Sequence, residues 1–180
     1  MQRITPVTDE TVPKESREPL ERIQARLRGR LNIHRTMAAS PVVIAAYDAL
    51  GGVIRERGTF DSATREAIAL SVAEINGCEY CLAAHTGLGR RAGLSPDTMR
   101  AIRRGDPSGD SRRDAMTAVA REAALDSGSV TESTWTAALA ADWSADELTE
   151  AFVHIIANVF TNYFNHYAHT QLDLPPAPSL

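Results

Sequence analysis

The chain has 180 residues, of which 19 are basic and 23 acidic, a formal net charge of −4 at pH 7, and two cysteines. This length suffices for one substantial hydrophobic core, so folding does not require a disulfide framework. Neither sign of charge forms a long block, which argues against a nucleic-acid partner, and no apolar run approaches the ~18 residues of a membrane span. With no secretory signal visible, we expect a soluble, cytoplasmic protein with no membrane partner.

The first part of the chain predicts an arm followed by two helices. Residues 1–14 contain two prolines and show no periodicity, so they are expected to form an extended N-terminal arm. Apolar residues at helical spacing predict helices over residues 16–29 and 41–54. Gly51 and Gly52 weaken the middle of the second helix, where we expect a bend or the close approach of another backbone.

Two further helices follow, joined by a very short connector. The third is predicted to begin after a cap at Asp61 or Ser62 and to stop at Asn76-Gly77. The fourth starts at once, with Cys78 in its first turn, and continues to about Arg91. Because the connector is so short, the two helices are expected to fold back on each other.

Two later helix starts resemble each other and hint at an internal repeat. Leu94-Ser95-Pro96-Asp97 and Trp143-Ser144-Ala145-Asp146 both place an apolar residue before a serine cap, and they lie 49 residues apart. A duplicated helical unit would put four unreactive residues at the positions that match Glu66, Cys78, Cys81 and His85. These four residues are Ala115, Ser127, Val130 and Thr134.

The last predicted helix is the longest, running from Ala145 to about Thr170. A broad apolar face is predicted for it, formed by Leu148, Phe152, Ile155, Ile156, Val159, Phe160 and Tyr163. We interpret His154, His166 and His169 as surface or capping groups. An asparagine stripe on the same helix is interpreted as interface hydrogen bonding.

No strand pattern competes with the helical periodicity, so the predicted class is all-α. The domain boundaries expected from these elements are an arm over residues 1–14, one helical domain over 15–172, and a proline-rich tail over 173–180. The tail is expected to be either disordered or docked on a neighbouring subunit.

Four residues of the third and fourth helices carry the candidate chemistry. Cys78, Cys81 and His85 are spaced to share one helical face, and the folded-back connector could bring Glu66 near them. A helix N-terminus and a neighbouring base both favour the reactive thiolate. The helix dipole and an exposed position favour Cys78 as the attacking thiol, whereas the i,i+4 relation to His85 favours Cys81, so these rules leave the choice open.

Other interpretations of the same residues remain. The cysteines could be inert buried thiols, or Cys78, Cys81 and His85 could bind zinc, although a structural zinc site needs a fourth Cys or His from elsewhere and the chain has no further cysteine. Glu74, four residues before Cys78, competes with Glu66 as the partner carboxylate.

The order glutamate, eleven residues, cysteine, two residues, cysteine, three residues, histidine resembles the core motif of the AhpD-like alkylhydroperoxidases, within the carboxymuconolactone decarboxylase superfamily. The resemblance covers about residues 60–104. It implies an AhpD-like helical bundle in homo-oligomers and a peroxidase cycle without metal or other cofactor. In that cycle the attacking thiol is Cys81, the resolving thiol Cys78, the base His85 and the relay carboxylate Glu66. Tyr80 stands where the best-described members have a histidine.

The function predicted from this resemblance is a thiol peroxidase. It would reduce organic hydroperoxides or peroxide while cycling a disulfide between Cys78 and Cys81, and would be recharged by an unidentified dithiol, thioredoxin-like or lipoyl reductant. Two alternatives remain: a decarboxylase-like lyase or isomerase that uses Glu66 and His85, and a non-catalytic redox-sensing or zinc-binding module.

Overall fold

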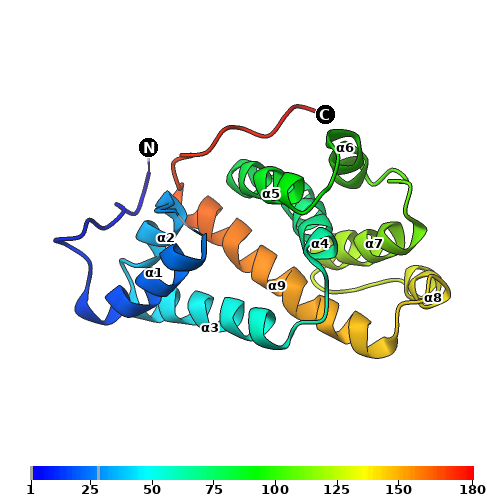
Figure 1. The fold of residues 1–180 in the computed structure, drawn as a ribbon, viewed down its shortest axis with the longest axis horizontal. Helices are drawn as coiled ribbons and strands as arrows, with labels where there is room; N and C mark the ends of the chain where they lie inside the picture. The colour runs from blue at the N-terminus through cyan, green and yellow to red at the C-terminus, as the bar shows by residue number, and fades with distance from the viewer. Residues whose placement is uncertain (1, 28) are drawn as a thin grey trace. The chain divides into compact units, whose positions relative to one another are not determined.

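The structure is a computed structural model that describes residues 2–27 and 29–180. Position 1, in the predicted arm, and position 28, in the predicted helical domain, lie outside the described residues. The described residues are helical and contain no strand, which confirms the predicted class (Figure 1). The helices are α1 (Lys14–Leu27), α2 (Asn32–Met37), α3 (Pro41–Arg57), α4 (Ser62–Ile75), α5 (Glu79–Arg91), α6 (Pro96–Arg104), α7 (Ser111–Leu125), α8 (Glu132–Ala140) and α9 (Ala145–Ala168).

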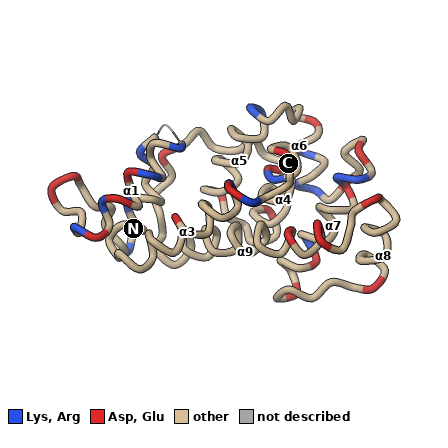
Figure 2. The backbone as a smooth tube through the Cα atoms, turned by 60° about the horizontal axis from the view of Figure 1, so that its bottom comes forward, with Lys and Arg blue, Asp and Glu red and all other residues tan. Residues whose placement is uncertain are grey.

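Two compact units divide the chain. The first unit contains the residues up to Gly58 together with Tyr163–Leu174, and the second unit contains Thr59–Asn162 together with Pro175–Leu180. Both cysteines lie in the second unit. Figure 2 shows acidic and basic residues interspersed along the helices rather than gathered into blocks of one sign. Within the described ranges, no helix combines the length and apolar composition that a bilayer crossing requires.

The core of the second unit forms around α4. This helix packs against α5, α6 and α7, and every side chain from Ala67 to Ala73 is buried. Phe60 and Trp143 meet edge to face with ring centroids 5.4 Å apart, an arrangement that aromatic rings prefer. Because α4 is covered on most sides, its backbone is held rigidly, and a side chain such as Glu66 has a fixed origin.

The helix boundaries of the second unit show the same 49-residue spacing as the internal repeat that the sequence suggested. Ser62 and Ser111 begin α4 and α7, and Pro96 and Ala145 begin α6 and α9; both pairs are 49 positions apart. Their caps also correspond. The carboxylates of Asp61 and Asp110 accept from the backbone N–H three residues on, and the hydroxyls of Ser95 and Ser144 do the same. The two copies pack on each other through α4 and α7.

In helix α9, the apolar residues that are buried are not all those that the sequence predicted. Leu148 and Ile155 lie in the core of the second unit, whereas Phe152 is 59% exposed and Ile156 is 40% exposed. The apolar residues of this helix span more than one face, and only the stripe that contains Leu148 and Ile155 meets α4 and α7 residues in the core. The helix ends at Ala168, two residues before the predicted end.

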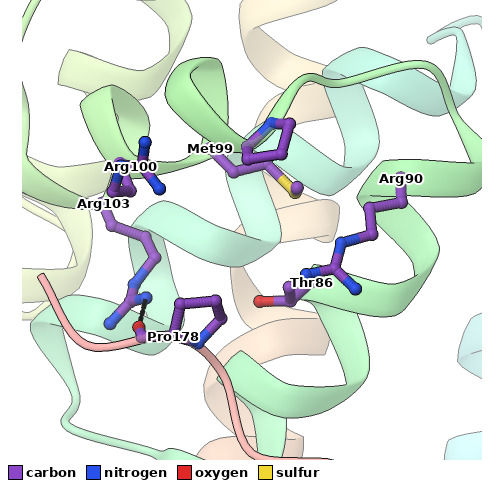
Figure 3. Close-up of a pocket in the computed structure, with 7 residues that line it drawn as sticks. Thr86, Arg90, Met99, Arg100, Arg103 and Pro178 are labelled. Carbon is purple, nitrogen blue, oxygen red and sulfur yellow. Dashed lines mark hydrogen bonds between the residues drawn. The ribbon is translucent and has the colours of Figure 1, made fainter.

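The proline-rich tail returns to the second unit. A guanidinium N–H of Arg103, on α6, donates to the carbonyl oxygen of Pro178 over 2.6 Å (Figure 3). The sequence offered two arrangements for this segment, disorder or a neighbouring subunit. The structure shows a third one, in which Pro178 contacts α6 of its own chain.

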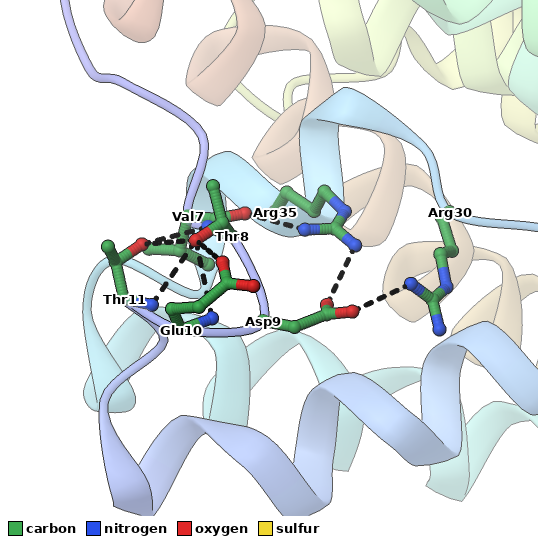
Figure 4. A network of polar contacts seen from close by, with 7 residues as sticks. All are labelled: Val7, Thr8, Asp9, Glu10, Thr11, Arg30 and Arg35. Atoms are coloured by element: carbon green, nitrogen blue, oxygen red, sulfur yellow. Dashed lines mark hydrogen bonds and ion pairs between the residues drawn. The ribbon is translucent and has the colours of Figure 1, made fainter.

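In the first unit, the segment before α1 is tied down by polar contacts (Figure 4). Arg35 donates to the carbonyl oxygen of Val7 over 2.8 Å, and the Asp9 carboxylate pairs with Arg35 and Arg30 at 3.0 Å each. Hydrogen bonds from Arg35 and Arg30 lower the pKa of Asp9. This part of the arm is therefore anchored to α2 and to the loop that precedes it.

Helix α3 runs unbroken through its paired glycines. The positions that a Cβ would take at Gly51 and Gly52 have no other described atom within 4 Å, so the predicted close approach of a backbone is wrong. Helices α2, α7 and α8 were not predicted; α2, with six residues, is too short to show a helical period.

Candidate active site

The turn between α4 and α5 sets the geometry of the cysteine pair. Gly77 adopts a φ of 62°, in the left-handed region that favours glycine, and the N–H of Cys78 donates back to the carbonyl oxygen of Ala73 over 2.9 Å. The connector therefore consists of only a few residues, and α5 starts directly beside the end of α4.

Cys78 is the N-cap of α5. Its Sγ accepts a hydrogen bond from the backbone N–H of Cys81 over 3.4 Å, which adds a sulfur cap to the first turn. The prediction of Cys78 within the first turn was off by one position, because its φ and ψ are extended. The expected exposure of Cys78 is wrong: it is 1% exposed and Cys81 3% exposed, because the first turn of α5 is packed against other parts of the second unit.

The second cysteine contacts the last helix. The two cysteines are not joined by a disulfide, and Cys81 Sγ lies 4.0 Å from the hydroxyl oxygen of Thr161, on α9. The Thr161 hydroxyl also lies 2.9 Å from the carbonyl oxygen of Asn158. A hydroxyl can accept from a thiol and can rotate to donate to a thiolate, so Thr161 can stabilise either protonation state of Cys81.

His85, on α5, and Glu66, on α4, form a polar pair between the two helices. The His85 Nδ1 lies 2.7 Å from a carboxylate oxygen of Glu66, and both side chains are mostly buried. Glu74, the competing carboxylate, pairs with Arg103 over 2.7 Å. The structure therefore favours Glu66 over Glu74 as the partner of the histidine.

The asparagine stripe of α9 includes a buried contact to the α4–α5 turn. Asn162 is completely buried, and its amide oxygen accepts from Asn76 over 2.9 Å. The interpretation of these asparagines as interface groups is therefore wrong for Asn162. Sequence reasoning did not identify Thr161 or Asn162 as site residues; the available signal was a polar face on an otherwise apolar helix.

His154 is not a surface histidine as predicted. It is buried, its ring stacks on Phe60 at a centroid distance of 5.0 Å, and its Nε2 lies 3.2 Å from a carboxylate oxygen of Glu150. Burial lowers the pKa of His154 and outweighs the opposing effect of Glu150. His166 and His169 are exposed, as predicted.

The zinc alternative gains no support from the geometry. Across residues 2–27 and 29–180, no three His, Cys, Asp or Glu side chains are grouped so that they could hold a metal ion. What the arrangement can do is acid–base and thiol chemistry. A covered thiol lies at a helix N-terminus, where the positive end of the dipole favours an anion, and a histidine–carboxylate pair belongs to the same helix pair.

Replacing Thr161 with valine is expected to lower the rate of Cys81 alkylation at neutral pH by about two- to tenfold, because the thiolate loses a hydrogen-bond donor. Iodoacetamide labelling of the Cys78→Ser background over a range of pH measures the apparent pKa of Cys81 directly. Thr161→Ser keeps the hydroxyl and should retain the parent profile. An identical profile for Thr161→Val would contradict this role.

Comparisons with known proteins find a family match for part of the chain and a shared fold for most of it. Residues 41–122 match the model of the carboxymuconolactone decarboxylase family. A stretch of 45 residues is 47% identical to an uncharacterized protein from Haemophilus influenzae, a match that covers 25% of this chain and only 40% of that relative.

Solved structures with the same fold are more distant in sequence. A peroxidase-related protein from Ralstonia eutropha, described as an alkylhydroperoxidase AhpD core, is 18% identical with a TM-score of 0.81, covering 96% of this chain and 92% of its own. One from Silicibacter is 20% identical with a TM-score of 0.73, covering 97% and 91%. The debrominase Bmp8, in complex with 2,3,4-tribromopyrrole, is 17% identical with a TM-score of 0.80, covering 94% and 91%.

At these identities the structural matches establish only the fold. The family match is to the segment of sequence that contains the candidate site. Residues 41–122, which carry the two cysteines, the histidine and the glutamate, thus match the carboxymuconolactone decarboxylase family model over a little less than half of the chain, and the fold that holds them is AhpD-like, as the sequence motif predicted.

Proposed function

We propose that the protein is a cytoplasmic thiol peroxidase that reduces organic hydroperoxides or hydrogen peroxide without a bound cofactor. The observation that supports this most directly is the 2.7 Å contact between His85 and Glu66, in the same helix pair as a buried Cys-x-x-Cys pair. Inert buried thiols would not need a histidine–carboxylate pair at this spacing, whereas thiol catalysis needs a base and a route for protons.

The first step consumes the peroxide. The Cys81 thiol gives its proton to the His85–Glu66 pair, and the thiolate attacks the terminal oxygen of the hydroperoxide. An S–O bond forms, the O–O bond breaks, and the leaving alkoxide takes a proton from the pair to depart as an alcohol. Cys81 is thereby oxidised to a sulfenic acid, and the peroxide is reduced by two electrons.

The second step protects the oxidised sulfur. The Cys78 thiol attacks the sulfenic sulfur of Cys81, an S–S bond forms, and water leaves. The resolving sulfur already lies next to the residue that it attacks, because Cys78 Sγ accepts from the backbone N–H of Cys81 over 3.4 Å. A dithiol reductant, of the thioredoxin-like or lipoyl class, then exchanges with the disulfide and restores both thiols.

We expect the peroxidase to act as a homo-oligomer with other copies of this chain. Phe152 and Ile156 are one turn apart on α9 and both are exposed, which is costly for a large apolar pair in water.

A brominated ring is a second electron acceptor to test, because a debrominase with the same fold binds 2,3,4-tribromopyrrole. The electrons balance in the same way: two thiols become a disulfide while a carbon–bromine bond becomes carbon–hydrogen and hydrogen bromide is released. The lyase alternative, which uses Glu66 and His85 alone, predicts activity that survives the loss of both thiols.

Intact-mass analysis tests the proposal. After one equivalent of cumene hydroperoxide, the wild-type chain should lose the mass of two hydrogens as the disulfide forms. Cys81→Ser should lose none, and Cys78→Ser should gain one or more oxygens because the sulfenic acid has no resolving thiol.

One further arm, with a different electron acceptor, makes the mass result decisive. A parallel sample with tribromopyrrole in place of the hydroperoxide identifies the electron acceptor. Only the true acceptor should oxidise Cys78 and Cys81 when about one equivalent is added per chain. A wild-type chain that keeps its mass with every acceptor would overturn the proposed cycle.

A further inference from the structure

A small pocket in the second unit lies between α5, α6 and the returning tail. Thr86 and Arg90 of α5 line one side of it, Arg100 and Arg103 of α6 line the other, and Met99 and Pro178 complete the wall (Figure 3). The empty space is about 270 Å³ including the mouth. Most of this space is open to solvent and the enclosed part has room for little more than a water molecule, so the recess suits only the head group of a ligand whose remainder lies along the mouth.

The pocket carries an excess of positive charge. Three guanidinium groups line it, but only two of them pair with a carboxylate. Arg103 pairs with Glu74 at 2.7 Å, and Arg100 pairs with Asp97. Among the residues that the structure describes, none forms an ion pair with Arg90. One guanidinium therefore faces the pocket uncompensated, and such a group matches the paired oxygens of a carboxylate or phosphate.

The other lining groups are fixed in place. Arg103 is only 7% exposed, and its guanidinium group donates hydrogen bonds to the Glu74 carboxylate and to the Pro178 carbonyl oxygen. Thr86 is 6% exposed and its hydroxyl points toward the interior of the pocket in Figure 3. A hydroxyl is a suitable donor to an oxyanion, so Thr86 supplies a buried polar group on the same side of the pocket as Arg90.

Apolar groups lie directly beside these charges. The thioether of Met99 and the ring of Pro178 both face the empty space. A bare inorganic ion would leave them in contact with water, whereas the short chain of an organic acid would cover them.

The geometry points to an oxyanion-binding site in this pocket, which takes the carboxylate or phosphate head of a small organic anion on Arg90 and Thr86 and packs its chain against Met99. Thr86 directly follows His85, so the site lies on the face of α5 that is about 100° round from the histidine. Binding there requires neither thiol, and the site stands whether or not the peroxidase cycle does.

Titration calorimetry with hexanoate, using the full chain, tests the site. Hexanoate should bind, its neutral analogue hexanamide should not, and Arg90→Gln should weaken hexanoate binding by about tenfold or more, because a charge-assisted hydrogen bond is lost. Arg91→Gln is the matched control, since Arg91 is the next residue, is also exposed and does not line the pocket. Thr86→Val should weaken binding by a smaller factor and marks the hydroxyl contact.

Inorganic phosphate and hexyl phosphate form the second arm. Hexyl phosphate that binds more tightly than hexanoate through Arg90 supports the site and identifies phosphate as the preferred head. Equal loss of binding in Arg90→Gln and Arg91→Gln, equal binding of hexanamide, or no heat up to about 10 mM ligand would each overturn the proposal. Far-UV circular dichroism of the variants confirms that they are folded.

Discussion

Replacing Glu66 with glutamine is expected to lower the rate of peroxide reduction by about 10²- to 10⁴-fold, the range that general acid–base groups contribute. The glutamine keeps the size of the side chain and can still meet His85 Nδ1, which lies 2.7 Å from the carboxylate. It cannot, however, stabilise the protonated imidazole that forms when His85 takes the thiol proton. Stopped-flow consumption of cumene hydroperoxide with excess dithiol measures the rate.

Glu74→Gln is the matched control for this variant. Glu74 lies on the same helix and is also paired, but its partner is Arg103 rather than the histidine. Its activity should stay within a few fold of wild type. The double variant Glu66→Gln, His85→Asn should be little slower than either single variant, because the two groups act as one unit. Activity that falls equally in Glu66→Gln and Glu74→Gln would show that neither carboxylate has a specific role.

The free energy of unfolding is expected to fall by about 3 kcal/mol between pH 7 and pH 4 through His34 alone. His34 is buried in the first unit against Tyr47, and burial lowers its pKa from 6.5 to about 4. At pH 7 the imidazole is neutral in both the folded and the unfolded chain. Below pH 6.5 the unfolded chain gains a proton that the folded chain does not, so stability is lost until pH 4, where both forms are protonated.

Urea unfolding of the wild type and of His34→Gln at several pH values measures this effect. The buried His154 and several carboxylates with lowered pKa also lose stabilisation in acid, so the informative quantity is the difference in slope between the two chains. His34→Gln should have the shallower slope, and His166→Gln, which changes an exposed histidine, should match the wild type. Parallel slopes for His34→Gln and wild type would contradict the assignment.

Local signals in the sequence predicted most of the longer helices and the contact between Glu66 and His85. The caps at Asp61 and Ser95 were visible because a short polar side chain precedes an apolar period, and both form the expected hydrogen bonds. The pairing of Glu66 with His85 followed from the motif and a short connector. In each case the information lies within about 25 residues of chain.

What the sequence did not predict depends on packing between distant segments. Thr161 meets Cys81 across 80 residues of chain, and Pro178 meets Arg103 across 75. The burial of Cys78 and the exposure of Phe152 depend on which face of a helix is covered, and apolar residues around most of α9 leave that face unspecified. The oligomeric state, the domain boundaries and the roles of the site residues stay predictions.

The sulfur of Cys78 has two functions that the proposed reaction brings into conflict. It caps the first turn of α5, and in the proposed reaction it is also the atom that forms the bond to the sulfur of Cys81. Once oxidised, it is a poorer acceptor for the Cys81 N–H, and the helix start loses a cap of about 1 kcal/mol. The oxidised enzyme would therefore fray at the turn that hides the disulfide from solvent, so the chemistry itself would open the site to the reductant.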